Sequence, residues 1–128
     1  MKRTRTFFAA AALLTSVALL APSTTLAADP VQARKDLKAM GVEYKPEEFA
    51  KAAGNGDMPA VKLFLDAGMD VNSGGGAAIG LAAGRGKTTM VEFLLSKGAK
   101  PTSSALGYAK TRGHKDIEKM LRDAGAKD

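Results

Sequence analysis

The sequence predicts an all-α fold, a solenoid of stacked helix–turn–helix repeats. Three segments align with one another without gaps, over residues 49–68, 79–98 and 106–125. Their internal and terminal glycines coincide, at Gly56, Gly86, Gly113 and at Gly68, Gly98, Gly125. The spacings of 30 and 27 residues are typical of stacked-repeat proteins, in which each unit buries its apolar face against its neighbours.

Each aligned segment has the pattern of two short helices joined by a glycine turn. The first helix carries a large apolar residue followed by two alanines in the first two units, as Phe49, Ala52, Ala53 and Ile79, Ala82, Ala83. The second carries apolar residues at i, i+3 and i+4, which form one stripe, as Val61, Phe64, Leu65 and Val91, Leu94, Leu95. The glycines fall where the turn and the C-terminal helix cap belong.

The third segment has charged residues at three positions that are apolar in the other two. They are Lys110, Glu118 and Arg122. A terminal repeat needs a polar outer face, so we expect this unit to cap the stack at its C-terminal end. Glu118 and Arg122 are spaced to form a favourable i,i+4 pair.

Residues 28–44 are expected to form an N-terminal capping helix. Asp29 followed by Pro30 is a typical helix start, with the aspartate as N-cap. Ala33, Leu37 and Met40 would then lie on one face, over the first unit. The alternative is a mobile N-terminal segment.

Residues 1–27 have the three parts of a secretory signal peptide. A basic start precedes an apolar run from Phe7 to Ala21, which is followed by small residues ending at Ala27. A membrane anchor is the alternative, but spanning a bilayer takes about 20 apolar residues. We therefore expect cleavage near Ala27, a periplasmic or secreted protein, and no stable membrane insertion after cleavage.

Removing that segment changes the charge of the chain. The whole sequence has 19 basic and 13 acidic residues, a net charge of +6, and residues 1–27 contain three of the basic ones. The remaining +3 is uneven, with −2 over residues 28–83 and +5 over residues 84–128. The chain has no cysteine and one histidine, which excludes a disulfide scaffold, a thiol nucleophile and a multi-histidine metal site.

The repeat resembles the ankyrin repeat over about residues 45–127. The matching motifs are Ala52-Ala53, Ala82-Ala83, Gly113-His114, Gly68-Met-Asp-Val-Asn72, Gly98-Ala99 and Gly125-Ala126. The family's T-P-L-H box is missing, and the units, about 45–74, 75–101 and 102–128, are shorter than the usual 33 residues. The missing residues follow each terminal glycine, so short turns near 72–76 and 100–103 should replace the family's hairpin fingers.

No candidate for catalysis survives this comparison. Gly84–Thr89 approaches a phosphate-binding loop, but the first glycine of that motif is replaced by Leu81. The resemblance gives His114, the one histidine, a structural place beside the inter-helix turn. No serine or threonine has a nucleophile-elbow pattern. We expect no enzyme activity, no cofactor and no metal.

The resemblance implies protein binding through the finger turns and the first helices. Together with the basic cluster at the inter-helix turns, the candidate partner-binding residues are Asn72, Ser73, Gly84, Arg85, Lys87, Thr102, Ser103, Lys110, Thr111 and Arg112. Stacking of the repeats should bring Arg85 and Arg112 side by side.

The resulting hypothesis is a monomeric, exported module that binds or regulates an envelope or periplasmic protein. The alternative is a binder of an anionic polymer or surface through the basic C-terminal half. Nucleic acid is not expected, because most of the aromatic residues after residue 27 fall at core positions of the repeat and leave no stacking platform for bases. These residues are Tyr44, Phe49, Phe64, Phe93 and Tyr108.

Overall fold

The computed structural model describes residues 28–128, and within that range it contains helices and no strand. The helices are α2 (Pro30–Ala39), α3 (Pro46–Asn55), α4 (Met58–Asp66), α5 (Ser73–Gly84), α6 (Thr88–Ser96), α7 (Ser103–Thr111) and α8 (Lys115–Asp123). The predicted all-α solenoid of helix pairs is confirmed. The predicted signal peptide lies outside the described residues.

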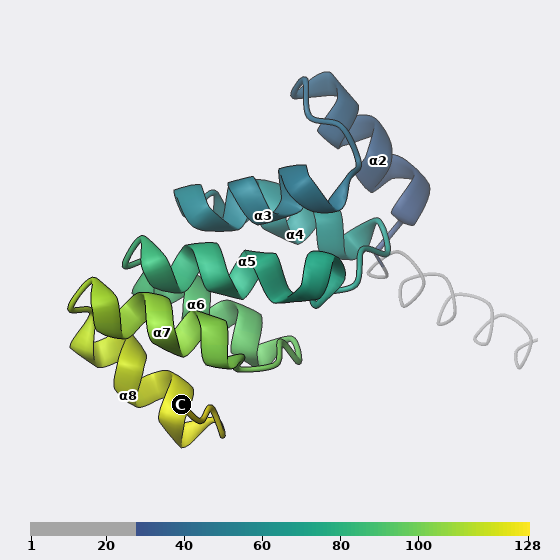
Figure 1. Ribbon diagram of the computed structural model, residues 1–128. Coiled ribbons are helices and arrows are strands. Elements are labelled where there is room, and N and C mark those ends of the chain that lie inside the picture. Colours follow the sequence, from purple (N-terminus) through teal and green to yellow (C-terminus); the bar gives the residue numbers. More distant parts are fainter. Residues whose placement is uncertain (1–27) are drawn as a thin grey trace, which may run out of the picture.

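The three helix pairs stack as two layers (Figure 1). One layer contains α3, α5 and α7, with α3 packed on α5 and α5 on α7, and the other contains α4, α6 and α8. The core between the layers repeats with the sequence, since its large side chains come from equivalent positions: Phe49, Ile79, Leu106 and Phe64, Leu94, Leu121. A further equivalent set is also buried, namely Ala60, Met90 and Ile117.

Each pair turns at a glycine with left-handed backbone. Gly56, Gly86 and Gly113 have φ values of 74°, 70° and 76°, which residues with a Cβ rarely adopt. After Gly56, the amide of Asp57 donates to the carbonyl of Ala52 at 2.9 Å. The glycine turn therefore satisfies a carbonyl at the end of the first helix and redirects the chain into the second.

The N-terminal helix α2 packs against α4 and covers the first pair. The Asp29 carboxylate accepts from the amides of Val31 and Gln32, at 3.0 and 3.3 Å, as its predicted N-cap role requires. Ala33 and Leu37 are buried as expected, but Met40 is 48% exposed. The expectation for Met40 is wrong because the helix ends at Ala39 and the chain then reverses.

The connection from α2 to α3, rather than Met40, makes the remaining contacts between the N-terminal segment and the first repeat. The amide of Val42 returns to the carbonyl of Leu37 at 2.9 Å, and the Val42 side chain packs on the core. The Tyr44 hydroxyl donates to the carbonyl of Ala67 at 3.2 Å. These contacts tie the N-terminal segment to the first repeat.

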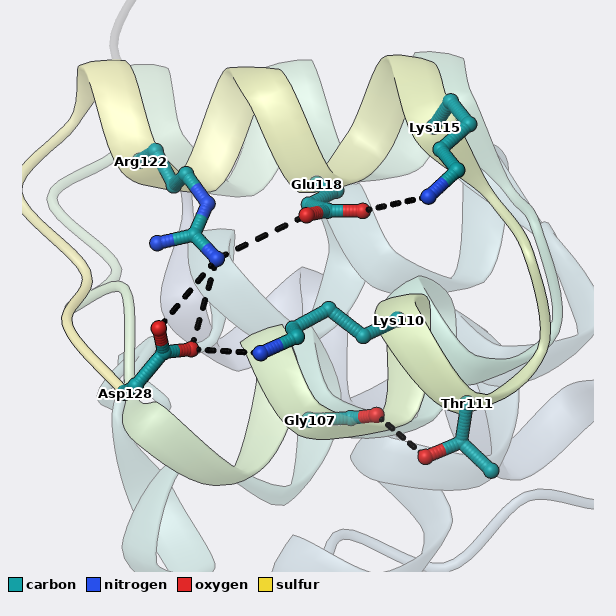
Figure 2. A network of polar contacts seen from close by, with 7 residues as sticks. All are labelled: Gly107, Lys110, Thr111, Lys115, Glu118, Arg122 and Asp128. Carbon is teal, nitrogen blue, oxygen red and sulfur yellow. Dashed lines mark hydrogen bonds and ion pairs between the residues drawn. The ribbon is translucent and has the colours of Figure 1, made fainter.

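At the other end of the stack, charged side chains form a connected network across α7 and α8 (Figure 2). Lys110 Nζ lies 2.8 Å from Asp128 Oδ1, and Arg122 Nη2 lies 3.3 Å from the same oxygen. The predicted pair between Glu118 and Arg122 is present at 3.5 Å. The outer side of the third repeat is therefore polar and internally paired, as a terminal repeat requires.

The turns that connect the repeats are short. Three successive glycines, Gly74–Gly76, have φ values of 68°, 68° and 84° and form a left-handed bend at the start of α5. The side chain of Asn72 links this turn to the next one, since its Nδ2 donates to the carbonyl of Gly98 at 3.2 Å and its Oδ1 accepts from the amide of Lys100 at 2.8 Å. Short turns replace hairpin fingers, as the sequence predicts.

Candidate functional site: a cleft between α5 and α7

A cleft of about 310 Å³ lies between the first helices of the second and third repeats. Its lining consists of two glycines, two arginines, a leucine and a tyrosine: Gly80, Leu81, Gly84, Arg85, Tyr108 and Arg112. Gly80 and Gly84 are four residues apart on α5, so they share one side of the helix. Because neither has a side chain, this side of α5 is open to α7.

Tyr108 lies along this open strip of α5. A Cβ atom at Gly80 would stand 3.7 Å from Tyr108 Cε2, and one at Gly84 would stand 3.3 Å from Tyr108 Cβ. The residue remains 51% exposed, so much of its ring is open to solvent. Among the five aromatic residues after residue 27, Phe49 and Phe64 are buried, whereas Tyr108 stands on glycines at the surface.

Arg85 and Arg112 come from equivalent positions of the second and third repeats, and both line the cleft. Arg85 Nη1 donates to Asn55 Oδ1 at 2.8 Å, and Arg112 Nη1 donates to the carbonyl of Gly84 at 3.4 Å. Within residues 28–128, neither guanidinium lies within 4 Å of a carboxylate. A guanidinium has five N–H donors, so each arginine keeps donors for a ligand.

His114 ties the second and third repeats together beside the cleft. Its Nε2 lies 3.2 Å from the carbonyl of Gly84, the same oxygen that Arg112 approaches. Its ring also covers the turn at Gly86, where a Cβ atom would be only 2.8 Å from His114 Cε1. This is the structural place beside the turn that the sequence predicts, since the ring contacts backbone.

Most of the other predicted site residues make contacts within the chain. Ser73 Oγ donates to the carbonyl of Asp70 at 2.6 Å, and Thr111 Oγ1 donates to that of Gly107 at 2.8 Å. Thr102 Oγ1 accepts from the amide of Ala105 at 3.0 Å and caps α7. Asn72 and Lys110 are engaged as described above. Of the ten predicted residues, the cleft therefore contains Gly84, Arg85 and Arg112.

Two predicted residues lie at helix starts away from the cleft. Ser103 is the exposed first residue of α7. Lys87 precedes α6, and its side chain lies over the turn of the first repeat, 3.3 Å from the place that a Cβ of Gly56 would occupy.

Sequence reasoning missed the contribution of Gly80, Leu81 and Tyr108 to this site. A signal was present in the alignment of the repeats. The second unit has glycine at two positions four residues apart on one helix, and the third unit has an aromatic residue on the helix that stacks against it. Such a pairing is typical of an aromatic ring resting on a glycine strip.

Shifted pKa values occur at exposed ion pairs of the surface. The hydrogen bond from Lys110 holds the pKa of Asp128 below its usual value, with a further contribution from Arg122. The hydrogen bond to Asp123 raises the pKa of Lys119.

Neither a metal cluster nor a membrane span was found in the part of the chain that the structure describes. Over residues 28–128, no three or more His, Cys, Asp or Glu side chains gather as a metal site would require. In the same range no helix has the length and apolar character needed to cross a bilayer.

Comparison with known proteins defines the class. The family model for ankyrin repeats, in three copies, matches residues 49–128. The chain belongs to the ankyrin-repeat family, whose repeats mediate protein–protein interaction. Myotrophin of Xenopus tropicalis is 48% identical to it over 56 residues, which cover 41% of this chain and 48% of myotrophin. The chain thus spans about half the length of this curated relative. No solved structure matches the chain.

Proposed function

We propose that the chain is an exported, non-catalytic module that acts as a monomer and binds or regulates a protein of the envelope or periplasm. The observation that supports binding is the cleft between α5 and α7. It presents an exposed tyrosine and two arginines that have no carboxylate partner within residues 28–128. Tyrosine and arginine are the residue types enriched where protein interfaces have their strongest contacts.

Export is supported by the pattern of residues 1–27. The test is to express the full-length chain in its source cells and to sequence the N-terminus of the exported protein. We expect it to begin at Ala28. A chain that retains Met1 and stays in the cytosol contradicts the export proposal.

Partner binding is tested by affinity capture with residues 28–128 as bait. We expect a protein from the exported fraction to be enriched, to bind the purified bait directly, and to be absent when a heat-unfolded bait is used. Sedimentation of the complex then gives its stoichiometry. Capture of cytosolic proteins only would contradict the proposed partner class.

A second candidate, binding of an anionic polymer or surface, is favoured by the charge of the C-terminal half. Ten basic residues lie in 84–128, and ion pairs engage four of them, namely Lys110, Lys115, Lys119 and Arg122. Polymer binding through counterion release falls steeply as salt rises, whereas a packed protein interface is less sensitive. Salt titration of the captured complex separates the two candidates.

A further inference from the structure

We propose that the cleft between α5 and α7 binds an acidic segment of a protein partner. A carboxylate of that segment would lie between Arg85 and Arg112, and a neighbouring apolar side chain would pack on Tyr108. This inference rests on the proposed function, because it names the chemistry of the partner that the cleft would recognise.

The repeats themselves show that the cleft is particular to this junction. On α3, the positions equivalent to Arg85 and Tyr108 are Asn55 and Lys51. The junction between the first and second repeats therefore has one guanidinium, that of Arg85, and the place of Tyr108 is taken there by Leu81. At the junction between the second and third repeats, an arginine on each helix flanks a tyrosine.

The charges of the cleft are complementary to a carboxylate. None of the six lining residues is acidic. Arg85 and Arg112 are held by one hydrogen bond each to neutral groups, Asn55 Oδ1 and the carbonyl of Gly84. These bonds orient the guanidinium planes without neutralising them. A carboxylate can accept two parallel N–H bonds from such a fork, which makes the contact strong and directional.

Apolar contact comes from Tyr108, Leu81 and the glycine strip. The exposed ring of Tyr108 offers a flat surface beside Leu81, which is itself half-buried. Gly80 and Gly84 let the Tyr108 side chain lie close against α5, which leaves the outer part of its ring for a bound segment. An acidic residue next to an apolar one would satisfy both parts of the cleft together.

A long polyanion fits this surface less well than a short acidic segment. Binding of single-stranded nucleic acid needs a continuous cationic groove and several stacking rings. The cleft has one ring. The next helix of the same layer, α3, carries Glu47 and Glu48 in its first turn. A chain of phosphates that continued from the cleft along α3 would pass the neutral Asn55, which Arg85 contacts, and would reach these carboxylates at the opposite end of the helix.

The probe is an acetylated and amidated tetrapeptide, Gly-Glu-Leu-Gly, compared with Gly-Gln-Leu-Gly. Each is titrated into isotopically labelled residues 28–128 while the side-chain resonances of Arg85, Arg112 and Tyr108 are followed by NMR. We expect saturable shifts of all three with the Glu peptide, and affinity for the Gln peptide weaker by about tenfold or more, since hydrogen bonds to a charged group are stronger than those to a neutral amide.

Two variants locate the binding. Arg85→Gln with Arg112→Gln should abolish it, whereas Lys100→Gln with Lys127→Gln removes the same charge from exposed residues outside the cleft and should leave it nearly unchanged. Gly80→Leu fills the cleft while keeping both arginines, and a Cβ at this position makes only ordinary contacts. It should also abolish binding, even if the double arginine variant proves unstable.

The proposal is overturned by equal shifts with the two peptides, by no saturable shift, or by binding that survives Gly80→Leu. It is also overturned if a thymidine oligonucleotide of about eight nucleotides shifts these resonances and the Glu peptide does not. If a captured partner binds the Arg85/Arg112 variant as well as the wild type, the cleft proposal fails and the proposed function stands. If the Glu peptide binds but no exported protein is captured, the cleft proposal stands and the proposed function fails.

Discussion

The two junctions between neighbouring repeats use equivalent positions but are closed in different ways. At the first junction the helices approach closely, since a Cβ at Gly54 would lie 3.0 Å from Leu81 Cβ and 3.2 Å from Arg85 Nη1. At the second, the equivalent Gly84 has Tyr108 Cβ at 3.3 Å, and the ring stands beside an open cleft. One backbone plan thus gives a closed junction and an open one.

The glycine turns at the two junctions also differ, in the side chain that covers each of them. The turn at Gly56 is covered by the flexible side chain of Lys87, with Cδ at 3.3 Å from the place of an added Cβ. The turn at Gly86 is covered by the rigid ring of His114, at 2.8 Å, which also contacts the carbonyl of Gly84. The second junction therefore has a cleft between its helices, and the contacts of His114 at the turn hold the two repeats together.

The largest loss of unfolding free energy should come from Gly86→Ala, and Gly56→Ala is the equivalent substitution in the first repeat. Both residues have positive φ, so each substitution should cost about 1–2 kcal/mol of unfolding free energy for left-handed backbone. Gly86→Ala should cost at least about 1 kcal/mol more, because the His114 ring must move and lose its contact with the carbonyl. Urea denaturation of the two variants measures the difference.

His114→Ala provides the control for that comparison. In a protein that lacks the ring, Gly86→Ala and Gly56→Ala should cost the same, and a double-mutant cycle gives the coupling energy directly. Equal losses in the presence of His114 would show that the ring does not hold the second junction.

A smaller change in melting temperature, of opposite sign at the two junctions, is expected when a glycine within a helix is replaced by alanine. Gly80→Ala should raise the melting temperature, since alanine in a helix interior gains about 0.5–1 kcal/mol over glycine and the new methyl meets the Tyr108 ring at 3.7 Å. Gly54→Ala has the same intrinsic gain but places its methyl 3.0 Å from Leu81 Cβ, so it should lower the melting temperature.

Thermal unfolding followed by circular dichroism compares these two variants with the wild type. A lower melting temperature for Gly80→Ala would mean that α7 needs the bare backbone of α5 at this point. A higher one for Gly54→Ala would mean that the first junction is not closed by direct helix contact.

The fold was accessible from the sequence because each repeat obeys the same local rules. The glycines at 56, 86 and 113 required left-handed turns, and the equivalent apolar positions required one shared core. The cleft could not be predicted in this way, because it depends on which side chains are missing from α5 at the place where α7 packs against it. Tyr108 occupies the repeat position of the half-buried Leu81, and its ring lies over Gly80 and Gly84, which have no side chains.

The capping role of the third repeat was predicted, but the part played by Asp128 was not. The charged residues at 110, 118 and 122 stood out because the other units are apolar there. Nothing in the repeat pattern indicates that the chain returns after α8 and places Asp128 beside Lys110 and Arg122 (Figure 2). Such a contact depends on the path of the last residues, which follow the final repeat.

The smallest effect concerns the outer side of the third repeat, where ion pairs connect α7, α8 and Asp128. Lys110 and Arg122 lower the pKa of Asp128 in the folded protein, so the stabilisation by its carboxylate is present above the ordinary aspartate pKa of about 3.9. It is lost as the pH falls through the lowered folded value. Asp128→Asn should therefore reduce stability slightly at pH 7 and have no effect in strong acid, as followed by urea denaturation across pH.

Because the pair is exposed, the loss at pH 7 should also shrink as salt is added. In a Lys110→Gln/Arg122→Gln background, Asp128→Asn should have no pH-dependent effect. If the loss persists there, or at high salt, then the returning chain itself rather than its charges protects the last repeat. The end of the stack would then be closed by packing, as the first junction is.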